Sequence, residues 1–371
     1  MKPNENLKEY KLCDLEYYKI LGRTDKTQYP LPLFWHGSAI EVNVTGTELW
    51  IDVEVDFDSQ EPWIATYINN VQVSRQMLTA GRHKICLFRS LSSETVKNIR
   101  FSRETQALSG DPNCHLLVHS FSSDGFFLPV SENALKLEFI GDSITSGEGT
   151  YGAHEETDWC SMWMSFSHTY GSMISADLDA DYSIVSQGGW GVLSSWDNDP
   201  HCNIPSIYEK ICGVSADAYG AQKPYDFNSF KPDAIIVNLG TNDASAFEQP
   251  AHTDPVTGEI FNQLKNPDGT YEASCLERFE QAVIAFLKMI RKHNETSKIV
   301  WVYGMLGYNL TLPIADAITR YSKETGDYDV SFLQAPNTTK ETVGSLEHPG
   351  LKSHERAAGV LMEYLKDLLS L

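Results

Sequence analysis

The sequence predicts an α/β protein in which an antiparallel β-sandwich of jelly-roll type precedes an α/β domain with a parallel sheet. Two observations predict this fold. Between about residues 40 and 129 apolar and polar residues alternate with a period of two, and after Asn133 short apolar runs alternate with helical stretches. The chain has 371 residues, which at about 150 residues per domain is enough for two domains. We therefore expect a β-sandwich domain over residues 1–132 and a second domain over residues 133–371.

The alternation in the first domain is clearest in one stretch that has an apolar residue at every second position: Leu49, Ile51, Val53 and Val55. A strand of this kind buries one face and exposes the other. Similar runs follow at residues 63–73, 83–88 and 115–118, and turn signals such as Asn-Asn, Ala-Gly and Ser-Asp-Gly lie between and after them. Short strands at this spacing are typical of an antiparallel sandwich or jelly roll.

The second domain has the pattern of buried strands and amphipathic helices. Three apolar runs have the length of strands that are buried on both faces of a parallel sheet, at residues 135–140, 234–239 and 299–302. Residues 276–290 and 357–368 have apolar side chains at three- and four-residue spacings, so each helix can cover one face. Residues 194–230 and 244–273 are polar and aperiodic. We expect them to form long loops at the carboxyl edge of the sheet, where loops shape binding sites.

The composition disfavours several classes of partner. Lys and Arg number 29 and Asp and Glu 50, so the formal net charge is −21, which opposes binding to nucleic acids and anionic membranes. The N-terminus is polar and charged, and no run of about 18 apolar residues follows it. We therefore expect a cytoplasmic protein without a membrane partner. The seven cysteines are scattered and form no CxxC pair, which favours reduced thiols over disulfides or a metal site.

The strongest functional motif is a serine that follows an apolar strand. Residues 139–149 read Phe-Ile-Gly-Asp-Ser-Ile-Thr-Ser-Gly-Glu-Gly, so Ser143 lies where the strands of an α/β sheet open to ligands. The glycines on either side let the backbone turn sharply and leave the Ser143 N–H free for a bound oxyanion. The alternative interpretation is an ordinary strand-to-loop turn with a capping serine.

Further motifs contain candidate oxyanion donors and a candidate general base for this serine. Gly189, in the run Gly-Gly-Trp, and Asn242, in the run Gly-Thr-Asn-Asp, each follow a strand-like run and so reach the same edge as Ser143. A glycine N–H and an asparagine NH₂ are donors that an oxyanion hole uses beside the amide of the nucleophile. His348 precedes the last predicted helix and could act as the general base.

These motifs resemble the ordered sequence blocks of the SGNH, or GDSL-type, hydrolases, whose catalytic domain is a three-layer α/β/α fold. Because a β-sandwich precedes the hydrolase part, the chain is most similar to carbohydrate esterase family two, the two-domain acetyl esterases of plant polysaccharides. The similarity covers nearly the whole chain. It implies that Ser143 is the nucleophile, that His348 is the base, and that the Ser143 N–H, the Gly189 N–H and the Asn242 side chain form the oxyanion hole. Gly188 is an alternative to Gly189.

One position departs from the superfamily pattern. SGNH enzymes commonly have an Asp three residues before the catalytic His, and Ser345 occupies that position here. The resemblance to family two implies a Ser-His dyad, because members of that family are known to act without the third residue. Adjacent side chains in an extended turn point to opposite sides, so Glu347 is not expected to orient His348. We expect a backbone carbonyl to fix the tautomer of His348.

Other residues have competing interpretations. Trp190 could stack on a sugar or cover the acetyl group, or it could be an ordinary core residue. Asp142 is expected to stabilise its own turn, and His354 to bond to backbone from a helix face. His201 and Cys202 are adjacent, but nothing else near them has the spacing of metal ligands, so we assign this pair to loop structure.

The predicted function is removal of O-acetyl groups from acetylated oligosaccharides, through an acetyl-enzyme on Ser143 and without a cofactor. The polymer class, xylan or mannan, is implied by the family resemblance alone. One alternative is a lipase or thioesterase of the same superfamily, which would need an apolar acyl groove. The other is a carbohydrate-binding protein in which the β-sandwich binds sugar and the hydrolase part is inert.

Overall fold

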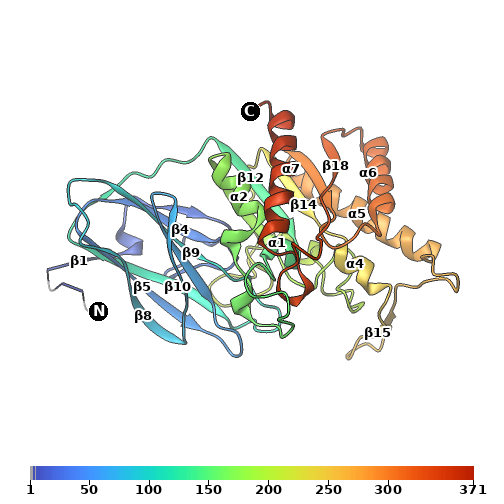
Figure 1. Cartoon of the computed structure of the whole chain (residues 1–371), viewed down its shortest axis with the longest axis horizontal. Helices are drawn as coiled ribbons and strands as arrows, with labels where there is room; N and C mark the ends of the chain where they lie inside the picture. The colour runs from blue at the N-terminus through green and yellow to red at the C-terminus, as the bar shows by residue number, and fades with distance from the viewer. Residues whose placement is uncertain (1–2, 5) are drawn as a thin grey trace. The chain divides into compact units, whose positions relative to one another are not determined.

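The computed structural model describes residues 3–4 and 6–371, which form two compact units (Figure 1). The first unit contains the chain up to Ala134 together with Trp159–Ser167 and Lys210–Tyr225. The second contains Leu135–Asp158, His168–Glu209 and Asp226–Leu371. The main division of the chain therefore falls close to the change of pattern after Asn133, but two later segments of the chain group with the first unit.

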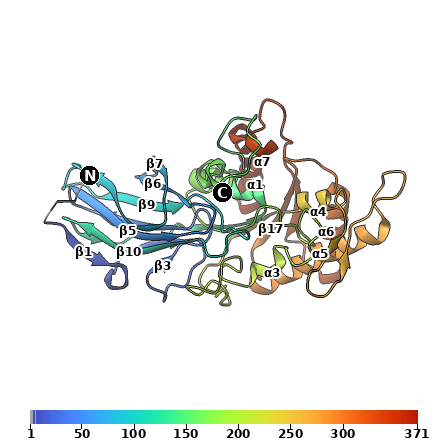
Figure 2. The same ribbon diagram turned by 90° about the horizontal axis from the view of Figure 1, so that it is seen from below.

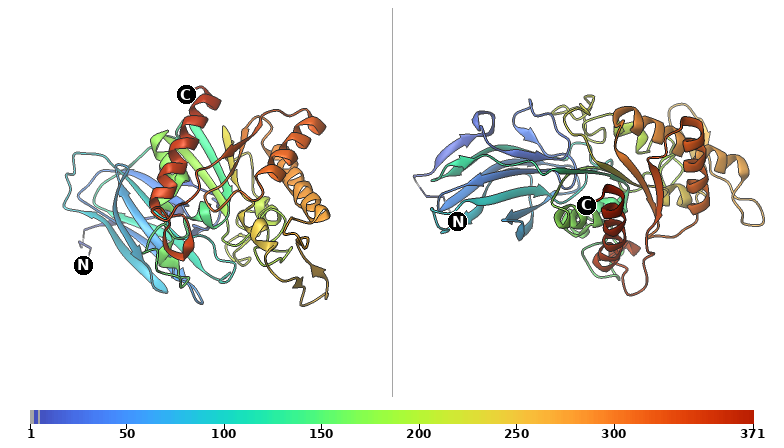
Figure 3. Two further views of the ribbon diagram at one scale, coloured as in Figure 1. Left: turned by 45° about the vertical axis from the view of Figure 1, so that its right-hand side comes forward. Right: turned by 90° about the horizontal axis from the view of Figure 1, so that it is seen from above.

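The first unit has two antiparallel sheets (Figure 3). One has the strand order β1-β10-β5-β8, with β3 paired to β10, and consists of β1 (Lys8–Lys11), β3 (Leu31–Pro32), β5 (Glu48–Asp56), β8 (Gly81–Arg89) and β10 (His115–Ser123). The other has the order β11-β4-β9-β6-β7, with β2 paired to β4, and consists of β2 (Lys19–Leu21), β4 (Ala39–Val44), β6 (Trp63–Ile68), β7 (Val71–Met77), β9 (Lys97–Arg103) and β11 (Phe127–Leu128). A short 3₁₀ helix, η1 (Leu12–Asp14), follows β1.

The period-two pattern produces the core of this unit. Ile51 and Val53 of β5 are fully buried, whereas Asp52 between them is half-buried. Apolar residues of β4 belong to the same buried cluster as those of β5, so the two sheets share one core. The turn between β6 and β7 consists of Asn69 and Asn70 at φ 50° and 66°, and two central residues at positive φ are what a type I′ hairpin requires.

The two later segments complete the first unit by pairing buried polar groups. Ser165 Oγ donates a hydrogen bond to Glu104 Oε2 at 2.6 Å, and Glu104 is fully buried. The carbonyl oxygen of Ile211 accepts a hydrogen bond from the buried indole N–H of Trp35 at 2.9 Å. Buried polar groups need partners of this kind. The segments that supply them have no periodicity, so the sequence did not assign them to this unit.

The second unit contains a parallel five-stranded sheet with the order β13-β12-β14-β17-β18, formed by β12 (Leu135–Gly141), β13 (Ala180–Ser186), β14 (Ala234–Asn238), β17 (Lys298–Tyr303) and β18 (Val330–Gln334). Two long helices, α5 (Ala273–His293) and α6 (Thr311–Thr325), pack together on one face, while α2 (Tyr170–Asp177) and α7 (Leu351–Leu369) pack together on the other (Figures 1 and 2). The expected α/β fold with a parallel sheet is confirmed.

The segments between these elements contain only short structure. Helix α1 (Ser143–Ser146) follows β12, and α4 (Thr241–Ala246) follows β14. The two polar stretches contain α3 (Pro205–Tyr208) and the hairpin of β15 (His252–Thr253) and β16 (Ile260–Phe261). Of the remaining 3₁₀ helices, η4 (Ser345–Glu347) lies in the second unit, and η2 (Ser161–Trp163) lies in a segment that groups with the first unit. The third, η3 (Phe166–His168), begins in that segment and ends in the second unit. Within residues 3–4 and 6–371, no helix is both long and apolar enough to cross a membrane.

Candidate active site

Three neighbouring strands of the parallel sheet end at the same level. Gly141, the last residue of β12, is paired with Ser186 of β13 on one side and with Asn238 of β14 on the other. The chain leaves all three strands at their carboxyl ends, the edge at which open α/β sheets bind ligands. The segments that follow carry Ser143 and the predicted oxyanion donors.

Ser143 and His348 are in direct contact. Ser143 Oγ lies 2.9 Å from His348 Nε2. The other ring nitrogen, Nδ1, lies 2.8 Å from the carbonyl oxygen of Leu346. A carbonyl oxygen only accepts hydrogen bonds, so Nδ1 carries the proton and Nε2 is left to accept from the serine hydroxyl. This geometry suits general-base activation of Ser143.

The carbonyl of Leu346 reaches the ring because the backbone before His348 is sharply bent. Leu346 and Glu347 have φ values of 58° and 56°, a left-handed conformation that is unfavourable for residues other than glycine. Ser345, which occupies the position of the Asp in the SGNH pattern described above, donates its hydroxyl to the carbonyl oxygen of Tyr151 at 2.8 Å. The contact to Nδ1 thus comes from the backbone, as expected from the sequence.

The predicted oxyanion donors differ in how their hydrogens are used. Ser143 is the first residue of α1, so its N–H has no acceptor within the helix. Gly189 has a φ of 78°, and its N–H has no hydrogen-bond partner within the described part of the chain. Asn242 Nδ2 donates to Asp142 Oδ2 at 3.2 Å and to the carbonyl oxygen of Trp190 at 3.1 Å. A bound oxyanion would therefore share one of the two amide hydrogens of Asn242.

Asp142 holds the Ser143 turn. Its Oδ1 accepts a hydrogen bond from the Ile144 N–H at 3.0 Å and so caps α1, which is the structural role expected from the sequence. The carboxyl is fully buried, and this burial, together with repulsion from Glu148 and Asp243, raises its pKa to about 7. Asp142 also accepts from Asn242, so it connects the predicted nucleophile turn to a predicted oxyanion donor.

Asp243 is a structural residue that the sequence did not reveal. Its carboxylate accepts hydrogen bonds from the backbone N–H groups of Val192 at 2.9 Å and Leu193 at 2.8 Å, and so fixes the loop after Gly189. A Cβ at Gly191 would lie 2.3 Å from Asp243 Oδ2, so a larger residue there would displace the carboxylate from these contacts. Burial raises the pKa of Asp243 to about 6, although its bonds to backbone N–H groups favour the ionised form.

Two tryptophans lie next to Gly189 and differ in exposure. Trp190 is 9% exposed, and its carbonyl oxygen accepts from Asn242. Trp196 is 47% exposed, and its backbone N–H donates to the carbonyl oxygen of Gly189 at 2.9 Å. A Cβ built at Gly189 would lie 3.1 Å from Trp196 Cδ1. The exposed ring beside Gly189 is therefore Trp196, which its aperiodic sequence context did not single out.

Two further histidines have structural contacts. His354 is fully buried, and its Nδ1 accepts a hydrogen bond from the Tyr170 N–H at 3.2 Å. Burial lowers its pKa to about 3, so the ring is neutral near pH 7. His201 Nε2 lies 3.0 Å from Asp254 Oδ2. Within the described residues, no group of three or more His, Cys, Asp or Glu side chains is arranged to hold a metal ion.

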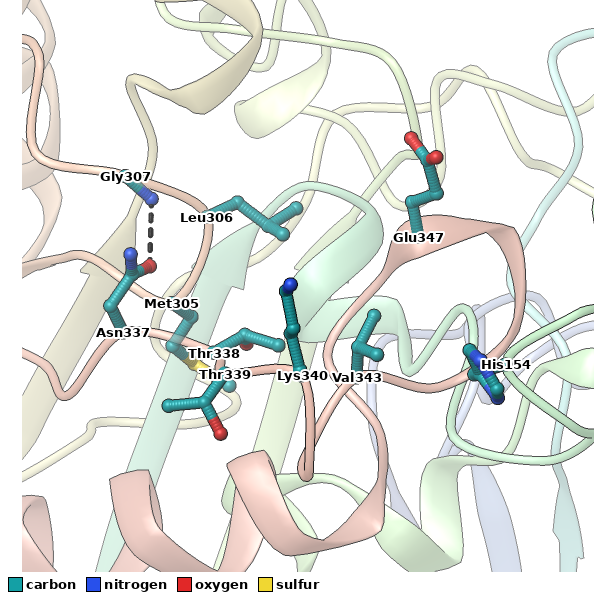
Figure 4. Close-up of a pocket in the computed structure, with 10 residues that line it drawn as sticks. All are labelled: His154, Met305, Leu306, Gly307, Asn337, Thr338, Thr339, Lys340, Val343 and Glu347. Atoms are coloured by element: carbon teal, nitrogen blue, oxygen red, sulfur yellow. Dashed lines mark hydrogen bonds between the residues drawn. The ribbon is translucent and has the colours of Figure 1, made fainter.

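A groove of about 510 Å³ lies beside the turn that carries His348 (Figure 4). Leu306 and Val343 contribute apolar side chains to it, and Lys340 extends between them (Figure 4). Glu347, the neighbour of His348, lines it as well. The mixture of apolar surface with one positive and one negative side chain suits a polar ligand that also has apolar faces.

Residues 137–342 match the family described as GDSL-like Lipase/Acylhydrolase. The chain belongs to this family. Among solved structures, this GDSL-like protein is similar to an acetyl xylan esterase from the rumen bacterium Butyrivibrio proteoclasticus, with 49% identity, a TM-score of 0.96, and coverage of 98% of this chain and 99% of that chain. It also shares its fold with a family two carbohydrate esterase from Clostridium thermocellum in complex with cellohexaose, with 21% identity, a TM-score of 0.79, and coverage of 95% and 99%.

Curated proteins of the same kind match over only part of their length. The cellulase/esterase CelE of Acetivibrio thermocellus is 22% identical over 90% of this chain, and that match covers 37% of the relative. An acetylxylan esterase / glucomannan deacetylase of Cellvibrio japonicus is 25% identical over 62% of this chain, and that match covers 62% of the relative. The resemblance to GDSL-type hydrolases, and to carbohydrate esterases among them, is confirmed.

Proposed function

We propose that this chain is a serine esterase that removes O-acetyl groups from acetylated plant-polysaccharide oligosaccharides of the xylan or mannan type. The observation that carries the proposal is the 2.9 Å contact between Ser143 Oγ and His348 Nε2, with Nδ1 held by the Leu346 carbonyl. The 49% identity to an acetyl xylan esterase supports the substrate class. The name of the Cellvibrio japonicus relative, which includes glucomannan deacetylase, supports mannan as a second polymer.

In the proposed reaction, Ser143 and His348 act as a catalytic dyad. His348 Nε2 takes the hydroxyl proton while Ser143 Oγ attacks the acetyl carbonyl carbon. The N–H groups of Ser143 and Gly189 and the Nδ2 of Asn242 donate to the oxyanion. His348 then protonates the departing sugar oxygen, and the acetyl group stays on Ser143 as an acetyl-enzyme. A water molecule, deprotonated by His348, releases acetate, and the proton returns to Ser143, so the steps balance without a cofactor.

The two tryptophans and the groove supply the proposed substrate contacts. The exposed ring of Trp196 beside Gly189 can stack on the apolar face of a sugar. Trp190, which is buried, forms the inner wall of the acetyl pocket and limits acyl length. The groove that contains Lys340 and Glu347 receives sugar units next to the acetylated one. These contacts favour a carbohydrate leaving group over a long acyl chain.

We also propose that residues 1–132 form a jelly-roll domain and that residues 133–371, apart from the two segments that group with the first unit, form the SGNH catalytic domain. Two antiparallel sheets with one shared core support the first assignment. The parallel sheet with helices on both faces supports the second.

The decisive experiment follows acetylated oligoxyloside and oligomannoside by NMR during incubation with the protein. We expect loss of ester signals from sugar hydroxyls and release of acetate, and the spectra identify the polymer and the hydroxyl position together. Ser143→Ala protein is the control. Efficient hydrolysis of octanoyl nitrophenyl esters without sugar deacetylation would support a lipase or thioesterase, and sugar binding without hydrolysis would support an inert binding protein.

A further inference from the structure

Glu148 is a buried acid that the proposed mechanism does not use. It is 5% exposed, and its Oε2 lies 3.9 Å from His348 Nε2. Nε2 is the nitrogen that receives the proton of Ser143, whereas the acid of a catalytic triad faces Nδ1. The carboxylate therefore approaches the ring from the side on which the proton is transferred.

The backbone holds Glu148 in this place. Its N–H donates to the carbonyl oxygen of Ser143 at 3.0 Å. Gly147 and Gly149 on either side have φ values of 80° and 78°, a conformation that favours glycine. A Cβ at Gly149 would lie only 2.5 Å from the Cβ of His348. Because the two segments touch at this glycine, the position of Glu148 relative to the ring is fixed by packing.

The other groups around His348 do not provide a comparable negative charge. Its Nδ1 faces the neutral carbonyl of Leu346. His354 is buried, and burial together with the nearby His168 and His348 lowers its pKa, so it is uncharged near pH 7. Asp142 is buried, and its pKa is raised to about 7, in part by Glu148, so it is incompletely ionised there. Glu347 follows Leu346 in the turn, but its side chain is exposed to water, which screens it.

We propose that Glu148 is a positioning residue of the dyad, whose carboxylate stabilises the protonated ring of His348 from the Nε2 side. This inference rests on the proposed function of Ser143 and His348. Opposite charges about 4 Å apart interact several times more strongly in a partly buried site than in water. The acid of a catalytic triad both orients the histidine and stabilises its protonated form. Here the Leu346 carbonyl orients the ring but carries no full charge, and Glu148 provides the negative charge.

Kinetics of Glu148→Gln on nitrophenyl acetate test this role. We expect kcat to fall about tenfold or more with little change in KM, and the acid limb of kcat/KM to move to lower pH, because the variant lacks the negative charge that favours the protonated ring. Glu148→Asp keeps the charge but retracts it by one methylene, so it should give an intermediate result. Glu341→Gln, which removes an exposed acid from the loop before His348, is the matched control and should behave like wild type.

A second measurement does not depend on activity. The imidazole titration of His348, followed by NMR of histidine labelled at Cε1 and assigned with His348→Gln protein, should have a lower midpoint in Glu148→Gln than in wild type and Glu341→Gln. Equal midpoints in wild type, Glu148→Gln and Glu148→Asp would overturn the inference and leave Glu148 a packing residue. Full activity of Ser143→Ala protein would instead overturn the proposed function, while the titration would still report on the contact.

Discussion

The turns that carry Ser143 and His348 hold their side chains by different means. The Ser143 turn begins a helix, and the Asp142 carboxylate caps it by accepting from the Ile144 N–H at 3.0 Å. The His348 turn has no such acid, and a backbone carbonyl 2.8 Å from Nδ1 does the orienting. One turn therefore depends on a side chain and the other on backbone shape. The main chain, and not a carboxylate, thus orients the proposed base His348.

The backbone conformation of the turn before His348 has to be stabilised by neighbouring contacts. Two successive non-glycine residues in the left-handed conformation cost about 1–3 kcal/mol each, so neighbouring contacts have to hold the turn before His348. The Gly344 N–H donates to the carbonyl oxygen of His348 at 2.8 Å. A Cβ at Gly344 would lie 1.9 Å from the carbonyl oxygen of Gly149. The His348 turn is thus braced against the segment that follows Ser143.

The largest expected effect is that of Ser143→Ala, which removes the proposed nucleophile from the turn that Asp142 caps. Loss of a nucleophile costs on the order of 10⁶-fold in kcat, whereas the cap by Asp142 remains and the fold should persist. Acetate release measures the loss of activity, and thermal unfolding of the variant measures whether the fold persists. Residual activity above about one tenth of wild type would rule out Ser143 as the nucleophile.

Asn242→Ala should have the next largest effect, a loss of about 10²–10³-fold in kcat with much less change in KM. An oxyanion donor acts mainly in the transition state, and Asn242 Nδ2 is held beside the Ser143 turn by its bond to Asp142. Steady-state kinetics with nitrophenyl acetate provide the measurement. A rise in KM at constant kcat would make Asn242 a substrate-binding residue instead.

Trp196→Ala should mainly affect sugar binding. Stacking of an aromatic ring contributes about 1 kcal/mol, so we expect KM for an acetylated oligosaccharide to rise several-fold while nitrophenyl acetate kinetics stay close to wild type. Trp190→Ala is the comparison: it should relax the preference for acetyl over longer acyl esters, and because Trp190 is buried it should also destabilise the fold, by about 3–5 kcal/mol. Equal effects of Trp196→Ala on both substrates would argue against stacking.

The sequence predicts one of the two turns better than the other, and the reason is physical. The Ser143 turn rests on residue types, glycines and a capping Asp, which the sequence displays directly. The His348 turn rests on the φ values of Leu346 and Glu347, and neither residue type favours that conformation. The contact of a backbone carbonyl with Nδ1 could therefore be predicted only from the absence of an Asp at position 345. Glu148, Asp243 and Trp196 gain their contacts from chain segments that meet only in the fold. The sheets were predictable because the burial of a strand is encoded by residues that are neighbours in the sequence, as alternating or continuous apolar residues.

The smallest expected effect distinguishes the backbone interpretation from a hidden triad. Glu347 is adjacent to His348, but its side chain is exposed and lines the groove, while the Leu346 carbonyl already occupies Nδ1. Glu347→Gln should therefore cost less than about tenfold in kcat on nitrophenyl acetate, against about 10⁴-fold for loss of an orienting carboxylate in a triad. Any larger change should appear in KM for oligosaccharides, because Glu347 faces the groove. If Glu347→Gln lowered kcat about a thousandfold in a folded protein, Glu347 would be the third member of a triad, and the turn that carries His348 would depend on a side chain after all.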